Sequence, residues 1–446
     1  MCKMGTAACR DAGNSRIPRS RQGEPKRRGR IGLKEDDVMS ISPSSEEEIP
    51  AGIPYRPLLM TLAMQTIATM AAFSAPTIAP AIVEDLHVDG TMIGFFVSTV
   101  YGIGIFSAVL SPDFILRFGA VRVGQFVMLG TVAMLAIGGS DGLLGLGICA
   151  VVLGIGYGAT APVSTHLLIP RTRPKVLNLV FSIRQIGVPL GGVAAALCLP
   201  LLTVAFGWRM AFFAQIIPAV LLIIIFQLHR KSWDADRNPD HRLLKSEGLR
   251  PLYLLRDDKL MRVLATASFA YAGIQLCFIG FMSVHLTHKT NLDLVAAGQA
   301  LALYQISGVA SRPVWGWLAD KYLSAIRLLG LLGLIMALAA VAAGQLSENW
   351  PIIAIWLVCI VAGATASGFT GIAYGAFAAY GGKYRTEATA LGSSAMFAGV
   401  LILPTVFGVI VGRFGDYAEA YGILAVIALL TGLMLIFVKM PEREKP

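Results

Sequence analysis

Long apolar stretches separated by short polar connections recur along the chain from Pro57 to Val438. A helix needs about 20 apolar residues to cross a hydrocarbon core of about 30 Å, which is close to the length of each stretch. The apolar runs are continuous and do not alternate with polar positions, so they predict membrane-spanning helices and argue against a β-barrel. Twelve spans are predicted, at residues 57–80, 91–111, 120–139, 142–166, 176–203, 208–228, 261–285, 294–312, 325–345, 351–378, 387–411 and 417–438.

The composition agrees with this pattern. Of the 446 residues, 55% are hydrophobic and 14% are charged, and the mean hydropathy is +0.67. These values lie outside the usual range of soluble proteins and indicate an all-α polytopic membrane protein.

Lysine and arginine are distributed unevenly over the short connections between the predicted spans. The loops on one side of the predicted membrane domain carry ten basic residues, whereas the loops on the other side carry only Arg209, Lys289 and Arg413. Because basic loops stay in the cytoplasm, we expect the basic side and both termini to be cytoplasmic. The basic side carries Arg117, Arg122, Arg171, Arg173, Lys175, Arg312, Lys321, Arg327, Lys383 and Arg385.

A polar stretch from His229 to Lys259 divides the twelve spans into six and six. An offset of 204 residues aligns the first spans of the two halves, since Pro57 then corresponds to Met261. Two six-helix repeats around a central site are a common plan of transporters. The predicted parts are a disordered, basic, cytoplasmic tail at 1–56, helical bundles at 57–228 and 261–438, a cytoplasmic linker at 229–260 and a cytoplasmic tail at 439–446. Met39, which opens the run MSISPSSEEEIP, is an alternative start.

Arg184 is a charge inside an otherwise apolar or small run, NLVFSIRQIGVPLGG. If its span begins near Val176, it lies about 12 Å into the helix, close to the middle of the membrane. A charge there costs about 3 kcal/mol or more and is usually functional. The acidic residues of the neighbouring spans fall at predicted span ends, so no carboxylate partner is evident in mid-membrane.

Two interpretations of Arg184 follow. It is either the countercharge of an anionic substrate, because a guanidinium group suits a carboxylate or a phosphate, or a structural residue bonded to backbone carbonyls and hydroxyls. We favour the first, because isolated charges within a membrane are usually functional.

The connection after span eight, GWLADKYLSAIR, carries Gly316, Leu318, Ala319, Asp320 and Lys321. It is similar to the G-x-L-a-D-R/K pattern of the major facilitator superfamily, and the twelve-span topology extends the resemblance from about residue 57 to 438. In that family the loop acid and its basic neighbours stabilise a closed cytoplasmic state. The resemblance therefore implies gating roles for Gly316, Asp320 and Lys321. In the first-half copy Arg117 matches the pattern, but the acidic position is Leu116, so the gate is expected to be one-sided.

Spans one, four, seven and ten line the central cavity in that family. The resemblance thus places Gln65, Tyr157, Gln275 and Tyr374 beside the substrate, and Tyr304 and Gln305 of span eight are further candidates. Each of these residues could instead form an ordinary hydrogen bond between helices.

A second group of candidates is the run GVPLGG in span five. Gly187, Gly191 and Gly192 are expected to allow close helix packing, and Pro189 to bend the helix.

The chain is thus predicted to be a transporter of the cytoplasmic (inner) membrane that moves a small solute, expected to be an organic anion, by alternating access. Efflux of hydrophobic or drug-like compounds is the alternative, although Arg184 would repel cations. A membrane sensor and a membrane enzyme are more distant alternatives, because no nucleotide-binding loop is present and His285 and His288 lack a third metal ligand. We expect no cofactor, no metal, no nucleic-acid partner and a functional monomer; the coupling ion and the direction of transport stay open.

Overall fold

The structure is a computed structural model that describes residues 53–87, 91–140, 142–241, 243, 250–290, 292 and 294–438. Residues Ile49–Pro446 form one compact unit. The described residues contain helices and no strand. The predicted tail at 439–446, most of the tail at 1–56 and the centre of the linker lie outside the described residues.

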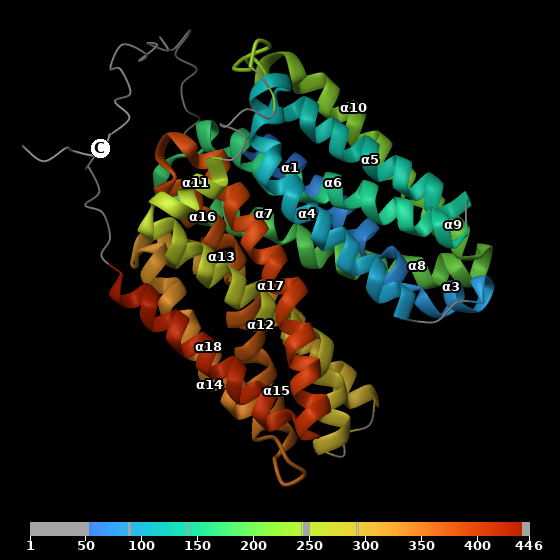
Figure 1. Cartoon of the computed structure of the whole chain (residues 1–446), viewed down its shortest axis with the longest axis vertical. Coiled ribbons are helices and arrows are strands. Elements are labelled where there is room, and N and C mark those ends of the chain that lie inside the picture. The colour runs from blue at the N-terminus through green and yellow to red at the C-terminus, as the bar shows by residue number, and fades with distance from the viewer. Residues whose placement is uncertain are drawn as a thin grey trace, which may run out of the picture. The chain divides into compact units, whose positions relative to one another are not determined.

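The first six spans form helices, three of them interrupted (Figure 1). Span one breaks at Phe73 and Ile78, span five at Ile186, and span six at Gln215. The helices are α1 (Tyr55–Ala72), α2 (Ser74–Thr77), α3 (Ala79–Leu86), α4 (Thr91–Phe118), α5 (Ala120–Ser140), α6 (Leu143–Leu168), α7 (Leu177–Gln185), α8 (Gly187–Phe206), α9 (Trp208–Ala214) and α10 (Ile216–Trp233).

The last six spans are also helical, and span ten contains a π-helical turn, η5 (Gly363–Ser367). A short helix, α11 (Arg250–Asp257), precedes them. The helices are α12 (Lys259–Lys289), α13 (Leu294–Lys321), α14 (Ala325–Gly344), α15 (Ile352–Ala362), α16 (Thr370–Tyr380), α17 (Arg385–Phe414) and α18 (Tyr417–Phe437).

Each of the twelve predicted spans therefore contains helix. Among the described residues, ten helical segments are long and apolar enough to cross a membrane, which agrees with a multi-pass membrane protein. The helices of spans one and eight are not among these ten. Breaks shorten the helices of span one, and Arg312, Asp320 and Lys321 lower the hydropathy of α13.

Two helices, α4 and α13, extend furthest beyond the spans that the hydrophobic pattern indicates. α4 continues to Phe118 and α13 to Lys321, so the motif around Asp320 lies in a helix and not in a loop. The prediction that Arg312 is a loop cation is wrong, because α13 continues nine residues beyond it and its side chain is 1% exposed. Pro313 does not end this helix.

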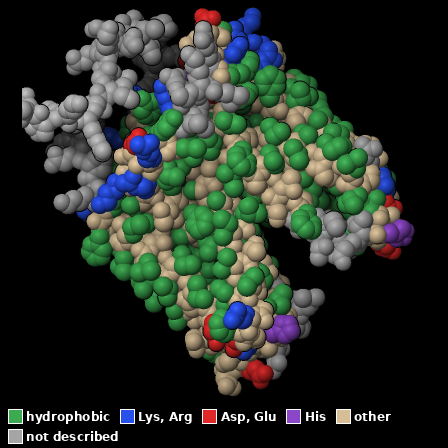
Figure 2. All heavy atoms as spheres, in the orientation of Figure 1, with side chains coloured by type: hydrophobic (Ala, Val, Ile, Leu, Met, Phe, Trp, Pro, Cys, Tyr) green, Lys and Arg blue, Asp and Glu red, His purple; other side chains and the backbone are tan. Residues whose placement is uncertain are grey.

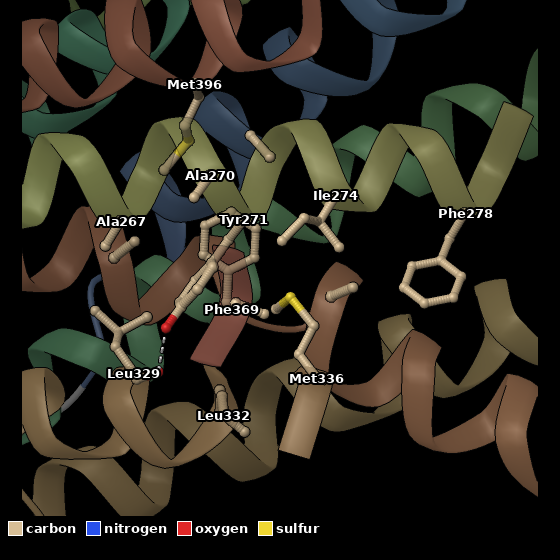
Figure 3. Packing of buried hydrophobic residues seen from close by; sticks show 14 of the residues in the cluster. Ala267, Ala270, Tyr271, Ile274, Phe278, Leu329, Leu332, Met336, Phe369 and Met396 are labelled. Carbon is tan, nitrogen blue, oxygen red and sulfur yellow. Dashed lines mark hydrogen bonds between the residues drawn. The ribbon is translucent and has the colours of Figure 1, made fainter. Parts of the chain in front are cut away.

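The C-terminal helices share one large apolar core (Figure 3). Tyr271 of α12 is fully buried in it and donates a hydrogen bond to the Leu329 carbonyl of α14 at 3.2 Å. Gly333 makes room for this ring, since a Cβ there would lie 1.9 Å from the Tyr271 hydroxyl. Phe278 and Met336 extend the same packing along α12 and α14.

The N-terminal helices (α1–α10) and the C-terminal helices (α12–α18) contact each other mainly through α4, α6 and α7 on one side and α13, α16 and α17 on the other. Some of these contacts lie at one end of the bundle. This end carries the connections before α7, after α13 and before α17, and we call it the basic end. At the opposite, far end the surface is hollowed between the two halves (Figure 2). The structure is therefore closed at the basic end and open at the far end.

Candidate functional site

Arg184 lies one residue before the end of α7, and its side chain is 1% exposed. Its Nε donates to Ser164 Oγ at 3.1 Å, and its Nη2 donates to Gln65 Oε1 at 2.8 Å and to the Thr160 carbonyl at 3.0 Å. Its Nη1 donates to Gln185 Oε1. The guanidinium group is thus surrounded by neutral oxygens from α1, α6 and α7.

No ion pair found among the described residues includes Arg184. Hydroxyl, amide and carbonyl oxygens accept four hydrogen bonds from its guanidinium group without neutralising its charge. A buried charge that has hydrogen bonds but no counterion stays electrostatically costly. Bonds to a hydroxyl and a backbone carbonyl are also what a structural arginine would make, so this geometry is compatible with both interpretations of Arg184.

The bonds continue from Arg184 into α1 and α6. Gln65 Nε2 donates to Thr69 Oγ1 at 3.0 Å, and Thr69 Oγ1 lies 3.3 Å from the Tyr157 hydroxyl. The Tyr157 ring stacks on Phe397 of α17, with a centroid separation of 5.7 Å. Two sequence candidates, Gln65 and Tyr157, therefore belong to one network with Arg184.

Arg312 is a second buried arginine, in α13 of the other half. Its Nη1 donates to the Gln185 carbonyl at 2.8 Å, across the boundary between the halves. Its Nε and Nη2 donate to the Ser367 carbonyl at 3.2 and 3.0 Å. Gln275 Nε2 donates to Ser367 Oγ at 3.3 Å, so this candidate joins the same network. Ser367 ends the π-helical turn, a feature that is frequent at functional sites.

The other candidates of the C-terminal half lie differently. The Tyr374 hydroxyl is 3.0 Å from Ser393 Oγ, within that half. Tyr304 is fully buried in the apolar core beside Phe278, and its hydroxyl donates to the Gln275 carbonyl at 3.4 Å. Gln305 is partly exposed on α13.

Asp320 lies against the first turn of α7. Its Oδ1 accepts hydrogen bonds from the backbone N–H of Asn178 at 3.0 Å and from Asn178 Nδ2 at 2.8 Å. Its Oδ2 accepts from the backbone N–H of Leu179 at 2.9 Å. Free N–H groups and the helix dipole make this a favourable position for a carboxylate.

Gly316 allows α13 to approach α7 closely. A Cβ at this position would lie 2.7 Å from Ser182 Oγ and 2.8 Å from the Asn178 carbonyl. The two basic gating candidates lie elsewhere: Lys321 packs over the Trp317 and Tyr322 rings, and Arg117 donates to the His241 carbonyl of the linker at 3.4 Å.

The glycines of α8 divide into two kinds. Added Cβ atoms would lie 2.8 Å from the Leu62 carbonyl at Gly187 and 2.4 Å from the Thr66 carbonyl at Gly191, so both pack on α1. Gly192 has no atom within 4 Å of such a Cβ and takes no part in this packing. Pro189 lies in the first turn of α8, next to the break at Ile186.

Sequence reasoning missed Gln185, Ser164 and Ser367 as well as Arg312. Small polar residues are common in membrane helices, and nothing in the sequence distinguishes these. A signal for Arg312 was present, because the apolar residues after Pro313 continue in helical register to Asp320. The helices also bury Asp113 and Glu387 near the basic end, with 3% and 7% exposure, where the sequence indicated no buried acid.

Two contacting sets of membrane helices with buried polar groups between them are a plan found in many multi-pass membrane transporters. The chain belongs to the Major Facilitator Superfamily, whose family model matches residues 61–380 and 264–446. It is a transporter and not an enzyme.

Two relatives and one solved structure illustrate the similarity. The chain is 26% identical over 326 residues to the 4-hydroxybenzoate transporter PcaK of Acinetobacter baylyi, covering 63% of this chain and 68% of the relative. It is 23% identical over 251 residues to the hexuronate transporter of Bacillus subtilis, covering 54% of this chain and 58% of the relative. A bacterial homologue of the iron transporter ferroportin, solved in an outward-facing state, shares the fold with a TM-score of 0.67 and 16% identity, over 86% of this chain and 98% of that chain.

Proposed function

We propose that the chain is a secondary transporter that moves a small organic anion across the cytoplasmic membrane by alternating access, with Arg184 as the countercharge of the substrate. The observation that carries this proposal is the burial of the Arg184 guanidinium group among neutral acceptors from three helices. Arginine offers two parallel donors to a carboxylate, so an anion could replace the amide oxygens of Gln65 and Gln185 and neutralise the charge.

The surroundings of Arg184 suit an organic anion better than an inorganic one. Tyr157, Tyr101 and Phe397 form an aromatic cluster, with centroid separations of 5.5 to 6.1 Å, and Tyr157 is bonded into the Arg184 network. The two relatives are named for 4-hydroxybenzoate and hexuronate, both of which are carboxylates, and this agrees with the proposal.

The alternative function, efflux of hydrophobic cations, fits the charges less well. Arg184 and Arg312 are both fully buried near the contact between the halves, and neither belongs to an ion pair found in the described residues. Two uncompensated positive charges oppose the entry of a cation.

The orientation follows from the positive-inside rule. Arg171, Arg173, Lys175, Lys383 and Arg385 lie at the basic end, so we assign this end and both termini to the cytoplasm. The structure then represents an outward-facing state, and its closed end is the cytoplasmic gate.

Binding to purified protein tests the proposal. Thermal shifts would be measured with monocarboxylates, dicarboxylates, phosphorylated metabolites, neutral solutes and cationic dyes, on the parent and on Arg184→Gln. The matched control is Arg327→Gln, which removes an exposed arginine from α14. We expect stabilisation by some carboxylates that is lost in Arg184→Gln and kept in Arg327→Gln. Stabilisation by neutral or cationic compounds alone, unchanged in Arg184→Gln, would reject the proposal and favour efflux.

A further inference from the structure

Helix α7 contacts α13 of the other half at both of its ends. Asp320 accepts hydrogen bonds from the first N–H groups of α7, at Asn178 and Leu179. Arg312 donates to the last carbonyl of α7, at Gln185. We call Arg312 and Asp320 the α7 clamp.

The spacing of the clamp matches the helix that it contacts. Arg312, Gly316 and Asp320 follow one another at intervals of four residues and so lie on one face of α13. Eight residues of helix measure about 12 Å, close to the length of a nine-residue helix such as α7. The acid lies at the N-terminus of α7 and the arginine near its C-terminus, so both charges complement the dipole of α7.

Pro189 explains why the Gln185 carbonyl is available to Arg312. In a continuous helix this carbonyl would accept from the N–H group four residues later, but that residue is Pro189, which has no N–H. The neighbouring carbonyl, at Ile186, does accept from Leu190 at 3.0 Å. Arg312 therefore supplies, from the other half, a donor that span five itself lacks.

Gln185 is shared by the two buried arginines. Its side-chain oxygen accepts from Arg184, and its backbone oxygen accepts from Arg312. It also lies next to Ile186, where span five breaks. The part before the break, α7, packs on the C-terminal half, and the part after the break, α8, packs on α1. A ligand that displaces the Gln185 side chain from Arg184 would move the residue to which Arg312 is bonded.

We propose that Arg312 is a gating residue that stabilises the closed basic end through the Gln185 carbonyl, and that Gln185 couples the occupancy of Arg184 to the release of α7. The gating role of Arg312 rests on alternating access and not on the identity of the substrate. In this proposal Arg312 is a positioning residue that does not contact the substrate.

The test is a spin-label distance measurement across the basic end. Labels at Lys175→Cys and Lys383→Cys, both exposed, would report the separation of the halves in the absence of any ligand. Cys2, Cys9 and the exposed Cys198 would first be replaced. We expect the parent to show mainly the short distance, and both Arg312→Gln and Asp320→Asn to raise the fraction at long distance at least twofold. The control Arg327→Gln should match the parent.

A second variant tests the same bond without removing a charge. Pro189→Ala restores an N–H group that can bond the Gln185 carbonyl within the helix and so compete with Arg312. It should also raise the long-distance fraction, whereas Pro200→Ala, in the same helix, should not. If Arg312→Gln does not fold, the comparison of Pro189→Ala with Pro200→Ala decides the question.

The coupling through Gln185 has its own readout. Benzoate, as the probe anion, should raise the long-distance fraction of the parent and change that of Gln185→Ala less than half as much. Distance distributions of Arg312→Gln and Pro189→Ala that equal the parent's would overturn the gating role, even if anion transport were demonstrated. An equal benzoate response in Gln185→Ala would overturn the coupling. If the parent protein binds none of the anions tested, the proposed substrate class is rejected. The comparison of label distances without ligand would still test the gating role of Arg312.

Discussion

Asp320 and Leu179 belong to different halves of the molecule, and the carboxylate of the first accepts a hydrogen bond from the backbone N–H of the second at 2.9 Å. This bond connects the end of α13 to the start of α7, at the end of the bundle where the halves meet. Opening of the basic end must separate these two residues. In the proposed alternating-access cycle this contact belongs to one state only, so its loss should affect turnover more than substrate affinity.

The first prediction concerns Asp320→Asn. The amide retains one acceptor but loses the charge that interacts with the dipole of α7, which weakens the contact by about 1 kcal/mol. We expect a several-fold loss of turnover in proteoliposomes, with substrate binding close to that of the parent. Transport kinetics equal to those of the parent would show that this carboxylate has no gating role.

The second prediction concerns Gly316→Ala. Its Cβ would lie 2.8 Å from the Leu179 Cα, and backbone at that distance cannot move aside cheaply. The variant should separate α13 from α7 and increase labelling of a cysteine at Ser182, measured with a membrane-impermeant maleimide on inverted vesicles. Gly298→Ala in the same helix, with nothing within 4 Å, is the control and should label like the parent. Equal labelling of the two variants would contradict the close approach.

The third prediction concerns stability. In Gly191→Ala the Cβ would lie 2.4 Å from the Thr66 carbonyl and 2.7 Å from Thr69 Cβ, so α8 must move away from α1. Overpacking of this kind costs about 1 to 3 kcal/mol. The melting temperature of the purified protein should fall by several degrees in Gly191→Ala and stay within about 1 °C of the parent's in Gly192→Ala, because small surface changes are close to neutral. Similar melting temperatures for both variants would reject the difference between the two glycines.

The fourth prediction separates two tyrosines. Tyr157→Phe removes a hydroxyl 3.3 Å from Thr69 Oγ1 in the Arg184 network, so binding of a stabilising anion should weaken about threefold to tenfold, as expected for a lost hydrogen bond. Tyr304→Phe removes a hydroxyl whose bond to the Gln275 carbonyl is 3.4 Å long, within the apolar core. It should leave anion affinity unchanged. A larger effect for Tyr304→Phe, measured by titration calorimetry, would place Tyr304 at the site after all.

The helical architecture could be predicted almost entirely from the hydrophobic pattern, because each membrane span must be apolar over a fixed length. The ends of the helices were less predictable. α13 remains helical through Arg312 and Asp320 because contacts with the other half satisfy these polar groups. A hydropathy pattern cannot reveal a partner in another span.

The candidate site could be predicted in part for a similar reason. A charge in an apolar run identifies Arg184, and the structure bonds it to Gln65 as one of its partners. Gln185 and Ser367 bond to Arg312 through carbonyl oxygens that every residue possesses, so no residue type marks this part of their role. The family resemblance favours Tyr157 over Tyr304, and the structure places Tyr157 in the Arg184 network and Tyr304 in the apolar core.

Counterflow in proteoliposomes tests the central claim most directly. Vesicles with reconstituted protein would be loaded with an unlabelled carboxylate that stabilises the parent, and uptake of the same labelled carboxylate would be followed in the parent, Arg184→Gln and Arg327→Gln. We predict uptake by the parent and Arg327→Gln, and a loss of at least tenfold in Arg184→Gln. Undiminished carboxylate uptake by Arg184→Gln would contradict the assignment of Arg184 as the countercharge of the substrate.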